Sequence, residues 1–179
     1  MTQTARIALP IRLDHRPETL LDQARWLYHE RPADTAVYLV ERDGDRAISY
    51  GEFFGQAARY AHALEAVGVQ PGDLVVLVLQ HGEDVLYGFW GAMLLGAAPS
   101  IFPFLTEKLD PVRYFDSVRQ LVARSEVRVV ITYPDLEPQL QETLRGIETL
   151  AAILNITMLE PGGDVHEYLA RNPARADDT

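Results

Sequence analysis

The spacing of apolar residues along this chain predicts both strands and helices. Leu74 to Leu79 are six apolar residues without alternation, the pattern of a strand covered on both faces of a parallel sheet. Residues 127–132, VRVVIT, predict a second buried strand, and residues 98–102, APSIF, a shorter one. Residues 151–159, AAILNITML, predict another strand after a helix within Pro138 to Arg145.

Helical periods separate these strands. Apolar residues recur at helical spacing from Leu20 to Tyr28, and Pro32 stops the pattern. Glu83 to Leu95 predicts a helix that is apolar nearly all round. Asp110 and Pro111 suit the N-cap and first position of a helix through Ala123.

A hairpin and a capped helix are expected between the first helix and the first buried strand. Asp43 and Gly44 separate two short runs rich in β-branched and aromatic residues, as in a β-hairpin. Ser49 and Glu52 have the spacing of a capping box, in which each side chain satisfies a free backbone N–H of the first turn. Gly68 predicts the end of this second helix.

The order of these elements predicts an α/β fold. A mostly parallel sheet should be flanked by helices, with a β-hairpin near the N-terminus. We expect an N-terminal extension at residues 1–16, an α/β unit at 17–170 and a polar linker at 171–179, where no apolar stripe occurs.

Composition excludes several classes of protein. The 179 residues carry a formal net charge of -10, which opposes the phosphate neutralisation that nucleic-acid binding requires. The absence of cysteine excludes disulfides, thiolate metal sites and thiol nucleophiles. No apolar window is long enough for a membrane span or a secretory signal, so we expect a cytoplasmic protein. Because of the acidic net charge, we expect no nucleic-acid partner.

Residues 88–104, GFWGAMLLGAAPSIFPF, contain three glycines and raise the question of a phosphate-binding loop. Such loops direct free backbone N–H groups at an anion from the start of a helix. Gly88 and Gly91 instead fall in the middle of the predicted helix, where their amides are already bonded. We interpret them as positions of close helix packing, with Gly96 as the left-handed residue that ends the helix.

Other candidate chemistry is weak. His81 lies at the carboxyl end of a buried strand, where open α/β sheets bind ligands, but with Gly82, Glu83 and Asp84 we favour capping of the next helix. The five histidines lack metal-ligand spacing, and no serine lies in a Gly-x-Ser-x-Gly elbow. We expect solvent exposure for a set of charged residues: Glu107, Lys108, Asp110, Arg113, Asp116 and Arg119.

Four pieces in order resemble the N-terminal part of the adenylate-forming superfamily, which includes acyl-CoA synthetases, fatty-acyl-AMP ligases and peptide-synthetase adenylation domains. They are ISYGEF, GVQPGDLVVLVL, FWGAMLLGAAPSIFPF and VRVVIT, within a resemblance that runs from about Leu20 to the C-terminus. The resemblance implies an ATP-dependent ligase that converts a carboxylate to an acyl-adenylate and pyrophosphate. The acyl group then passes to a thiol of CoA or of a carrier protein.

The family's catalytic motifs do not occur in this chain. The phosphate loop ending in lysine normally follows a short acidic lead-in, and residues 176–179, ADDT, resemble that lead-in. We therefore assign no catalytic, cofactor-binding or metal-binding residue and expect this portion alone to be inactive. ATP and Mg²⁺ would serve the complete enzyme, in which the rest of the polypeptide is the principal partner.

Two alternatives concern the acyl acceptor and the extent of the protein. Residues 102–104, Phe-Pro-Phe, and 133–135, Tyr-Pro-Asp, stand where CoA-using relatives contact the nucleotide, often through glycines and arginines, so a carrier protein stays open as acceptor. A free-standing α/β module for protein interaction or a small ligand, complete at Thr179, is the alternative function.

Overall fold

The structure is a computed structural model, and it describes residues 17–40 and 44–171. The expected extension at 1–16, Asp43 of the hairpin tip and residues 172–179 of the linker lie outside the described residues. Helices and strands follow one another in this order: α1 (Leu20–Glu30), β1 (Thr35–Leu39), β2 (Arg46–Ser49), α2 (Tyr50–Ala66), β3 (Leu74–Val78), α3 (Glu83–Leu94), β4 (Ala98–Ile101), α4 (Pro111–Arg124), β5 (Val129–Thr132), α5 (Glu137–Thr143), β6 (Ala152–Asn155), the 3-10 helix η1 (Ile156–Met158) and α6 (Val165–Arg171).

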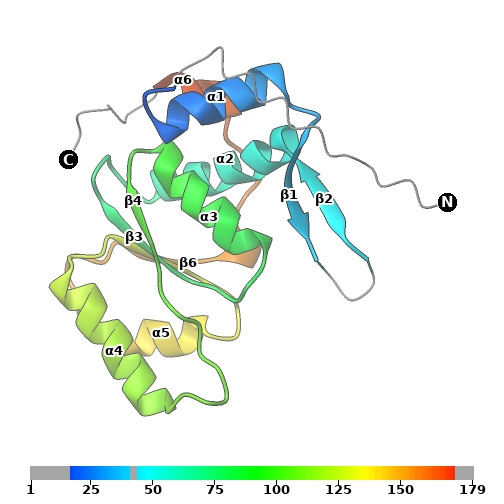
Figure 1. Ribbon diagram of the computed structural model, residues 1–179. Helices are drawn as coiled ribbons and strands as arrows, with labels where there is room; N and C mark the ends of the chain where they lie inside the picture. The colour runs from blue at the N-terminus through cyan, green and yellow to red at the C-terminus, as the bar shows by residue number, and fades with distance from the viewer. Residues whose placement is uncertain (1–16, 41–43, 172–179) are drawn as a thin grey trace.

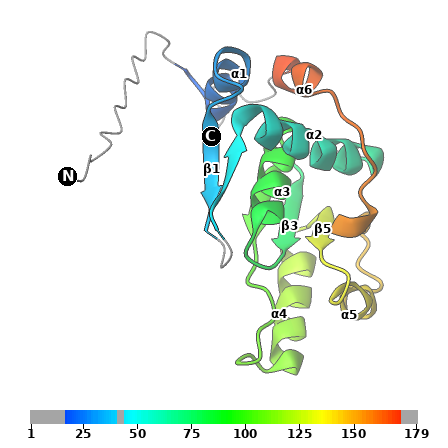
Figure 2. The same cartoon turned by 90° about the vertical axis from the view of Figure 1, so that its right-hand side faces the viewer.

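A four-stranded sheet forms the centre of the fold, in the order β4-β3-β5-β6, and every neighbouring pair is parallel. Helices α2 and α3 cover one face and α4 and α5 the other, while α1 and α6 form an outer layer over α2 (Figures 1 and 2). The predicted α/β class, parallel sheet and flanking helices are confirmed.

The unbroken apolar run of β3 follows from this layering. Val75 and Leu77 belong to the core beneath α2 and α3, while Val76 and Val78 belong to the core beneath α4 and α5. Successive side chains of a strand point to opposite faces, so a strand covered on both sides must be apolar at every position. The four side chains are fully buried.

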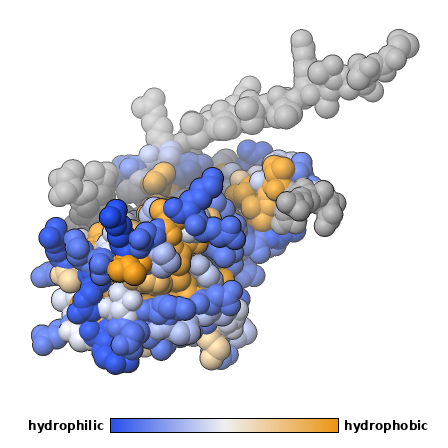
Figure 3. Space-filling view, turned by 90° about the horizontal axis from the view of Figure 1, so that it is seen from below, coloured by the Kyte–Doolittle hydropathy of each residue, from blue (hydrophilic) through white to orange (hydrophobic). Residues whose placement is uncertain are grey.

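The predicted hairpin is present as a separate antiparallel sheet of β1 and β2. It projects from the body beside α2 (Figure 1). Tyr38 and Val40 are 67% and 83% exposed on it. Seen from below, the body shows mostly hydrophilic side chains with apolar ones gathered in a band between them (Figure 3).

The expected capping box of α2 is only half formed. The Ser49 hydroxyl accepts a hydrogen bond from the Glu52 amide at 3.2 Å, as predicted. The Glu52 carboxylate, however, bonds the Arg46 guanidinium at 3.4 Å. A complete capping box occurs instead at the start of α1, between Thr19 and Asp22.

Gly88 and Gly91 lie where α3 contacts α2. A Cβ on Gly91 would lie 2.5 Å from the Tyr60 Cβ and 2.8 Å from the Ala57 carbonyl oxygen. A Cβ on Gly88 would lie 3.1 Å from a methyl of Leu77. Close packing therefore explains both glycines, and Gly96 has the expected positive φ of 73°.

The C-terminal part departs from the prediction at two points. The strand expected over 151–159 ends at Asn155, because the Asn155 side chain accepts from the Thr157 amide at 3.0 Å and the chain enters η1. The second departure is α6, which sequence analysis did not predict and which ends at Arg171, within the expected linker.

Candidate functional site

The carboxyl edge of the parallel sheet is the candidate site. From β3 the chain continues to β4 on one side, whereas β5 lies on the other side of β3. In open α/β sheets, ligands bind outside the carboxyl ends of strands at such a reversal of strand order. The loops after β3, β4 and β5 carry His81, Phe104 and Tyr133, respectively, at this edge.

Side chains tie β3 and β5 together at this edge. The buried Thr132 hydroxyl donates to the Val78 carbonyl oxygen at 3.2 Å. Tyr133 forms a side-chain hydrogen bond with Gln80. Burial raises the pKa of the Tyr133 phenol, Asp135 adds to the rise and the Gln80 bond opposes it. The phenol is therefore a neutral hydrogen-bonding group at physiological pH.

His81 does not cap α3. The N-cap residue is Gly82 without a side-chain cap, while the exposed His81 ring packs edge-on against Phe104 with centroids 5.1 Å apart. The capping interpretation is thus wrong for this side chain, because the aromatic neighbour holds the ring beside the next loop. Glu83 and Asp84 do lie in the first turn of α3, where negative charge complements the helix dipole.

Asp84 also connects α3 to α2. Its Oδ1 accepts a hydrogen bond from the Tyr60 hydroxyl at 2.5 Å. Burial, followed by the bond to Asp84, holds the pKa of Tyr60 far above its usual value. The contact fixes the start of α3, and with it the loop that carries His81.

A hollow of about 510 Å³ lies beside the β4 end of the edge. Phe102 and Tyr114 line it together with Lys108, Asp110 and Arg113. The Tyr114 hydroxyl donates to the Pro103 carbonyl oxygen at 2.8 Å, and Asp110 caps α4. As predicted, all members of the charged set are exposed to solvent: Glu107, Lys108, Asp110, Arg113, Asp116 and Arg119.

The residues that directly follow the strands do not fit a nucleoside triphosphate. Residues 79–82, 102–105 and 133–136 contain no lysine or arginine, and Glu83, Asp84 and Asp135 add negative charge. Lys108 and Arg113 lie further along, exposed at the hollow beside β4. Within residues 17–40 and 44–171, no group of three or more His, Asp or Glu side chains could hold a metal ion. None of the described helices is long and apolar enough to cross a membrane.

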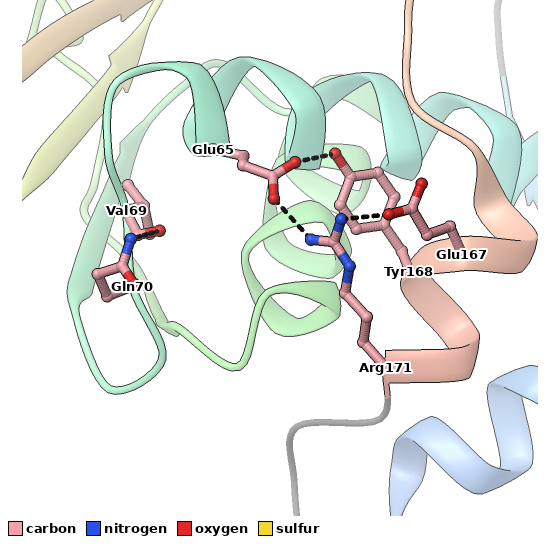
Figure 4. Close-up of polar contacts among 6 residues, drawn as sticks. All are labelled: Glu65, Val69, Gln70, Glu167, Tyr168 and Arg171. Carbon is pink, nitrogen blue, oxygen red and sulfur yellow. Dashed lines mark hydrogen bonds and ion pairs between the residues drawn. The ribbon is translucent and has the colours of Figure 1, made fainter.

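Sequence analysis missed a polar cluster that attaches α6 to α2 (Figure 4). The Tyr168 hydroxyl donates to Glu65 Oε2 at 2.8 Å, and Arg171 donates to Glu65 Oε1 at 2.6 Å and to Glu167 at 2.5 Å. The Arg171 hydrogen bond, followed by that of Tyr168, lowers the pKa of Glu65. The spacing of Val165, Tyr168 and Leu169 is the signal that could have predicted this helix.

The cluster fixes the end of the described chain. Tyr168 and Leu169 are buried, and the Arg171 guanidinium lies 5.0 Å from the centroid of the Tyr168 ring. Arg25 of α1 donates to the Leu169 carbonyl oxygen at 3.1 Å. Helix α6 is thus held by α1 and α2 as far as Arg171.

Curated relatives of the chain include acyl-CoA and peptide synthetases. It is 29% identical over 141 residues to an acetyl-coenzyme A synthetase of Alcanivorax borkumensis, covering 76% of this chain and 21% of the relative. It is 27% identical over 110 residues to gramicidin S synthase 2 of Brevibacillus brevis, covering 62% of this chain and 2% of the relative.

Solved structures share the fold. A fatty acyl-adenylate ligase from L. pneumophila, in complex with acyl adenylate and pyrophosphate, matches with a TM-score of 0.67 at 18% identity, over 87% of this chain and 25% of that one. A benzoate CoA ligase from Burkholderia xenovorans matches with a TM-score of 0.56 at 23% identity, over 84% and 28%. The chain therefore spans about a quarter of these structures and about a fifth or less of the two curated relatives. The family profile described as AMP-binding enzyme matches residues 24–177, and the chain belongs to that family.

Proposed function

We propose that this chain is the N-terminal portion of an ATP-dependent ligase that adenylates a carboxylic acid. The complete enzyme joins the carboxylate to AMP, releases pyrophosphate and transfers the acyl group to a thiol of CoA or of a carrier protein. The observation that carries this proposal is the family match over residues 24–177, which includes the whole central sheet.

Within that enzyme this portion is a scaffold. Its sheet edge has the position of a ligand site, but no lysine or arginine directly follows the strands and no phosphate loop occurs there, so the rest of the polypeptide supplies the phosphate loop and the catalytic groups. Residues 17–170 then form one α/β subdomain, and the stretch after α6 leads towards the phosphate loop. ATP with Mg²⁺, a carboxylate and an acyl acceptor are partners of the complete enzyme, for which a cytoplasmic location stays a prediction.

The test is pyrophosphate exchange by the whole gene product. In the presence of ATP and a panel of carboxylates, we expect exchange of labelled pyrophosphate into ATP with at least one acid. The 179-residue chain alone should show none. A reading frame without a Ser/Thr/Gly-rich loop ending in lysine soon after Thr179 contradicts the proposal, as does a whole product that adenylates no carboxylate.

A further inference from the structure

Two histidines that are far apart in the sequence meet in the outer layer of the fold. His29 lies in the last turn of α1, and His166 lies at the start of α6, which runs beside α1 over α2 (Figures 1 and 2). The centroids of their rings are 5.1 Å apart, and the ring planes are inclined by 38°. The histidines show no metal-ligand spacing in the sequence, yet the fold brings these two side chains into contact.

The backbones that carry the two rings are fixed relative to each other. Arg25 of α1 donates a hydrogen bond to the Leu169 carbonyl oxygen of α6 at 3.1 Å. The Asp164 carboxylate accepts a hydrogen bond from the His166 amide at 2.8 Å, as an N-cap residue does at the start of a helix. The distance between the two histidines is therefore set by the packing of α1 against α6.

Tyr28 orients both imidazole rings. Its own ring packs edge-on against His29, with centroids 5.4 Å apart, and against His166, with centroids 5.2 Å apart. Both histidines are nevertheless exposed to solvent. Among residues 17–40 and 44–171, no hydrogen bond or ion pair occupies the ring nitrogens of either histidine. The pair consequently offers two accessible nitrogen ligands on a rigid support.

The separation of the rings suits a single metal ion. Imidazole nitrogen binds Zn²⁺ at about 2.0–2.1 Å, which places the ion about 3 Å from the centre of each ring. At a tetrahedral angle, two such rings have centroids about 5 Å apart, in agreement with the 5.1 Å between His29 and His166. Since no group of three His, Asp or Glu side chains forms in the described part of the chain, water would complete the coordination.

The ligand atoms determine which ions fit. Imidazole favours Zn²⁺, Ni²⁺ and Cu²⁺, whereas Mg²⁺ and Ca²⁺ prefer oxygen ligands. The net charge of -10 attracts cations of either kind, so the preference depends on the two nitrogens. Two carboxylates beside His166 are already engaged, Asp164 with the His166 amide and Glu167 with Arg171.

We infer that His29 and His166 form a binding site for a divalent ion of the zinc, nickel and copper class. The bound ion bridges α1 and α6 and stabilises their attachment to each other. Two protein ligands hold an ion less tightly than the closed four-ligand sites of structural zinc, so the ion exchanges with solution. The inference goes beyond the proposed function and does not depend on it.

Calorimetric titration of the metal-free 179-residue chain with Zn²⁺ tests the site. We expect one bound ion, and His29→Gln and His166→Gln should each weaken its binding by about 10-fold or more. His81→Gln is the matched control and should bind as wild type does, because the exposed His81 ring contacts Phe104 and no histidine of the described chain. Mg²⁺ should not displace Zn²⁺. Absence of binding, or undiminished binding in either variant of the pair, overturns the inference.

Two measurements identify the ligands themselves. Electron paramagnetic resonance of bound Cu²⁺ should show two imidazole nitrogens in wild type and one fewer in each variant of the pair. His166→Cys should recover Zn²⁺ binding that His166→Gln loses, because a thiolate is also a zinc ligand and the chain has no other cysteine. A Cu²⁺ spectrum that is unchanged in His166→Gln, or a failure of the cysteine to rescue, contradicts coordination at this position.

Amide hydrogen exchange tests the bridge between the helices. Zn²⁺ should slow exchange of the Tyr168 and Leu169 amides of α6 by about 10-fold or more in wild type and leave it unchanged in His29→Gln, whose substitution lies on α1. Zn²⁺ binding without this protection overturns the bridging role. The whole gene product should likewise bind one Zn²⁺ more than its own His29→Gln variant, whether or not it exchanges pyrophosphate. Equal binding by those two proteins overturns the site but leaves the ligase function untouched.

Discussion

Gly91 of α3 lies against Tyr60 of α2 so closely that a Cβ on the glycine would be 2.5 Å from the Tyr60 Cβ. The backbone of α2 contributes to the same contact through the Ala57 carbonyl oxygen and the Ala61 amide nitrogen. Helix backbones cannot yield as the far end of a side chain can, so glycine is required at this position.

Replacement of Gly91 should therefore destabilise the protein despite the higher helix propensity of alanine. We expect Gly91→Ala to lower the free energy of unfolding by about 1–3 kcal/mol, the usual range for overpacking. Gly55→Ala is the matched control, because Gly55 lies exposed in α2 with nothing within 4 Å of an added Cβ. It should stabilise by about 0.5–1 kcal/mol in urea unfolding. Equal effects of the two changes would contradict the packing argument.

Much of the fold could be predicted because local signals agree with tertiary packing. The apolar run from Leu74, the N-cap at Asp110 and the mid-helix glycines each impose a constraint that the folded chain also obeys. At other positions a competing side-chain hydrogen bond determined the local structure. Asn155 ends β6 by bonding the Thr157 amide, and Arg46 takes the carboxylate that a capping box would have used.

The candidate site was less predictable, because its contacts join residues distant in sequence. The position of His81 at a strand end could be predicted, but its packing on Phe104 depends on where the next loop runs. Likewise, nothing near Glu65 indicates that Tyr168 and Arg171 will bind it across more than 100 residues. The order of the strands in the sheet also required the structure, because the sequence does not specify it.

The turn before α6 provides a second test of a required glycine. Gly163 has φ of +91°, and a Cβ there would collide with the Ala58 carbonyl oxygen of α2. Gly146 has a similar φ of +80° but open space around it. Gly146→Ala should cost about 1 kcal/mol from the left-handed backbone alone, and thermal unfolding should show a larger loss for Gly163→Ala. A loss no larger at Gly163 would show that the backbone there moves freely away from α2.

The Tyr60 hydroxyl should contribute to the attachment of α3. Tyr60→Phe removes the hydrogen bond to Asp84 and leaves the ring in place, so we expect a loss of about 1–3 kcal/mol. Tyr38→Phe is the control, because Tyr38 is 67% exposed on β1. That change should stay within about 0.5 kcal/mol. A near-zero effect at Tyr60 in denaturant unfolding would show that the bond is not needed to fix α3.

Nucleotide should not stabilise the 179-residue chain. Ligands raise the unfolding temperature only by binding the folded state, and the residues that directly follow the described strands include no lysine or arginine for a triphosphate. We expect no shift with millimolar ATP or AMP in a thermal-shift assay, and a clear shift with ATP in the whole gene product. Stabilisation of the short chain by ATP would mean that a nucleotide site lies within these residues.

The attachment of α6 should depend on pH through Glu65. Its pKa is lowered in the folded protein, mainly by Arg171, so the carboxylate stabilises the fold above the unfolded glutamate pKa of about 4.3. This contribution is lost as the pH falls through the lower folded value. At neutral pH, Glu65→Gln should therefore unfold at a lower temperature than wild type, and the difference should shrink below about pH 4. Because the Glu65 and Arg171 side chains are each 42% exposed, the effect at neutral pH should be modest and smaller in high salt.

Glu167→Gln is the control, because it removes only the contact within α6, and it should change the unfolding temperature less. A pH-independent difference between Glu65→Gln and wild type would contradict the role of the Glu65 charge.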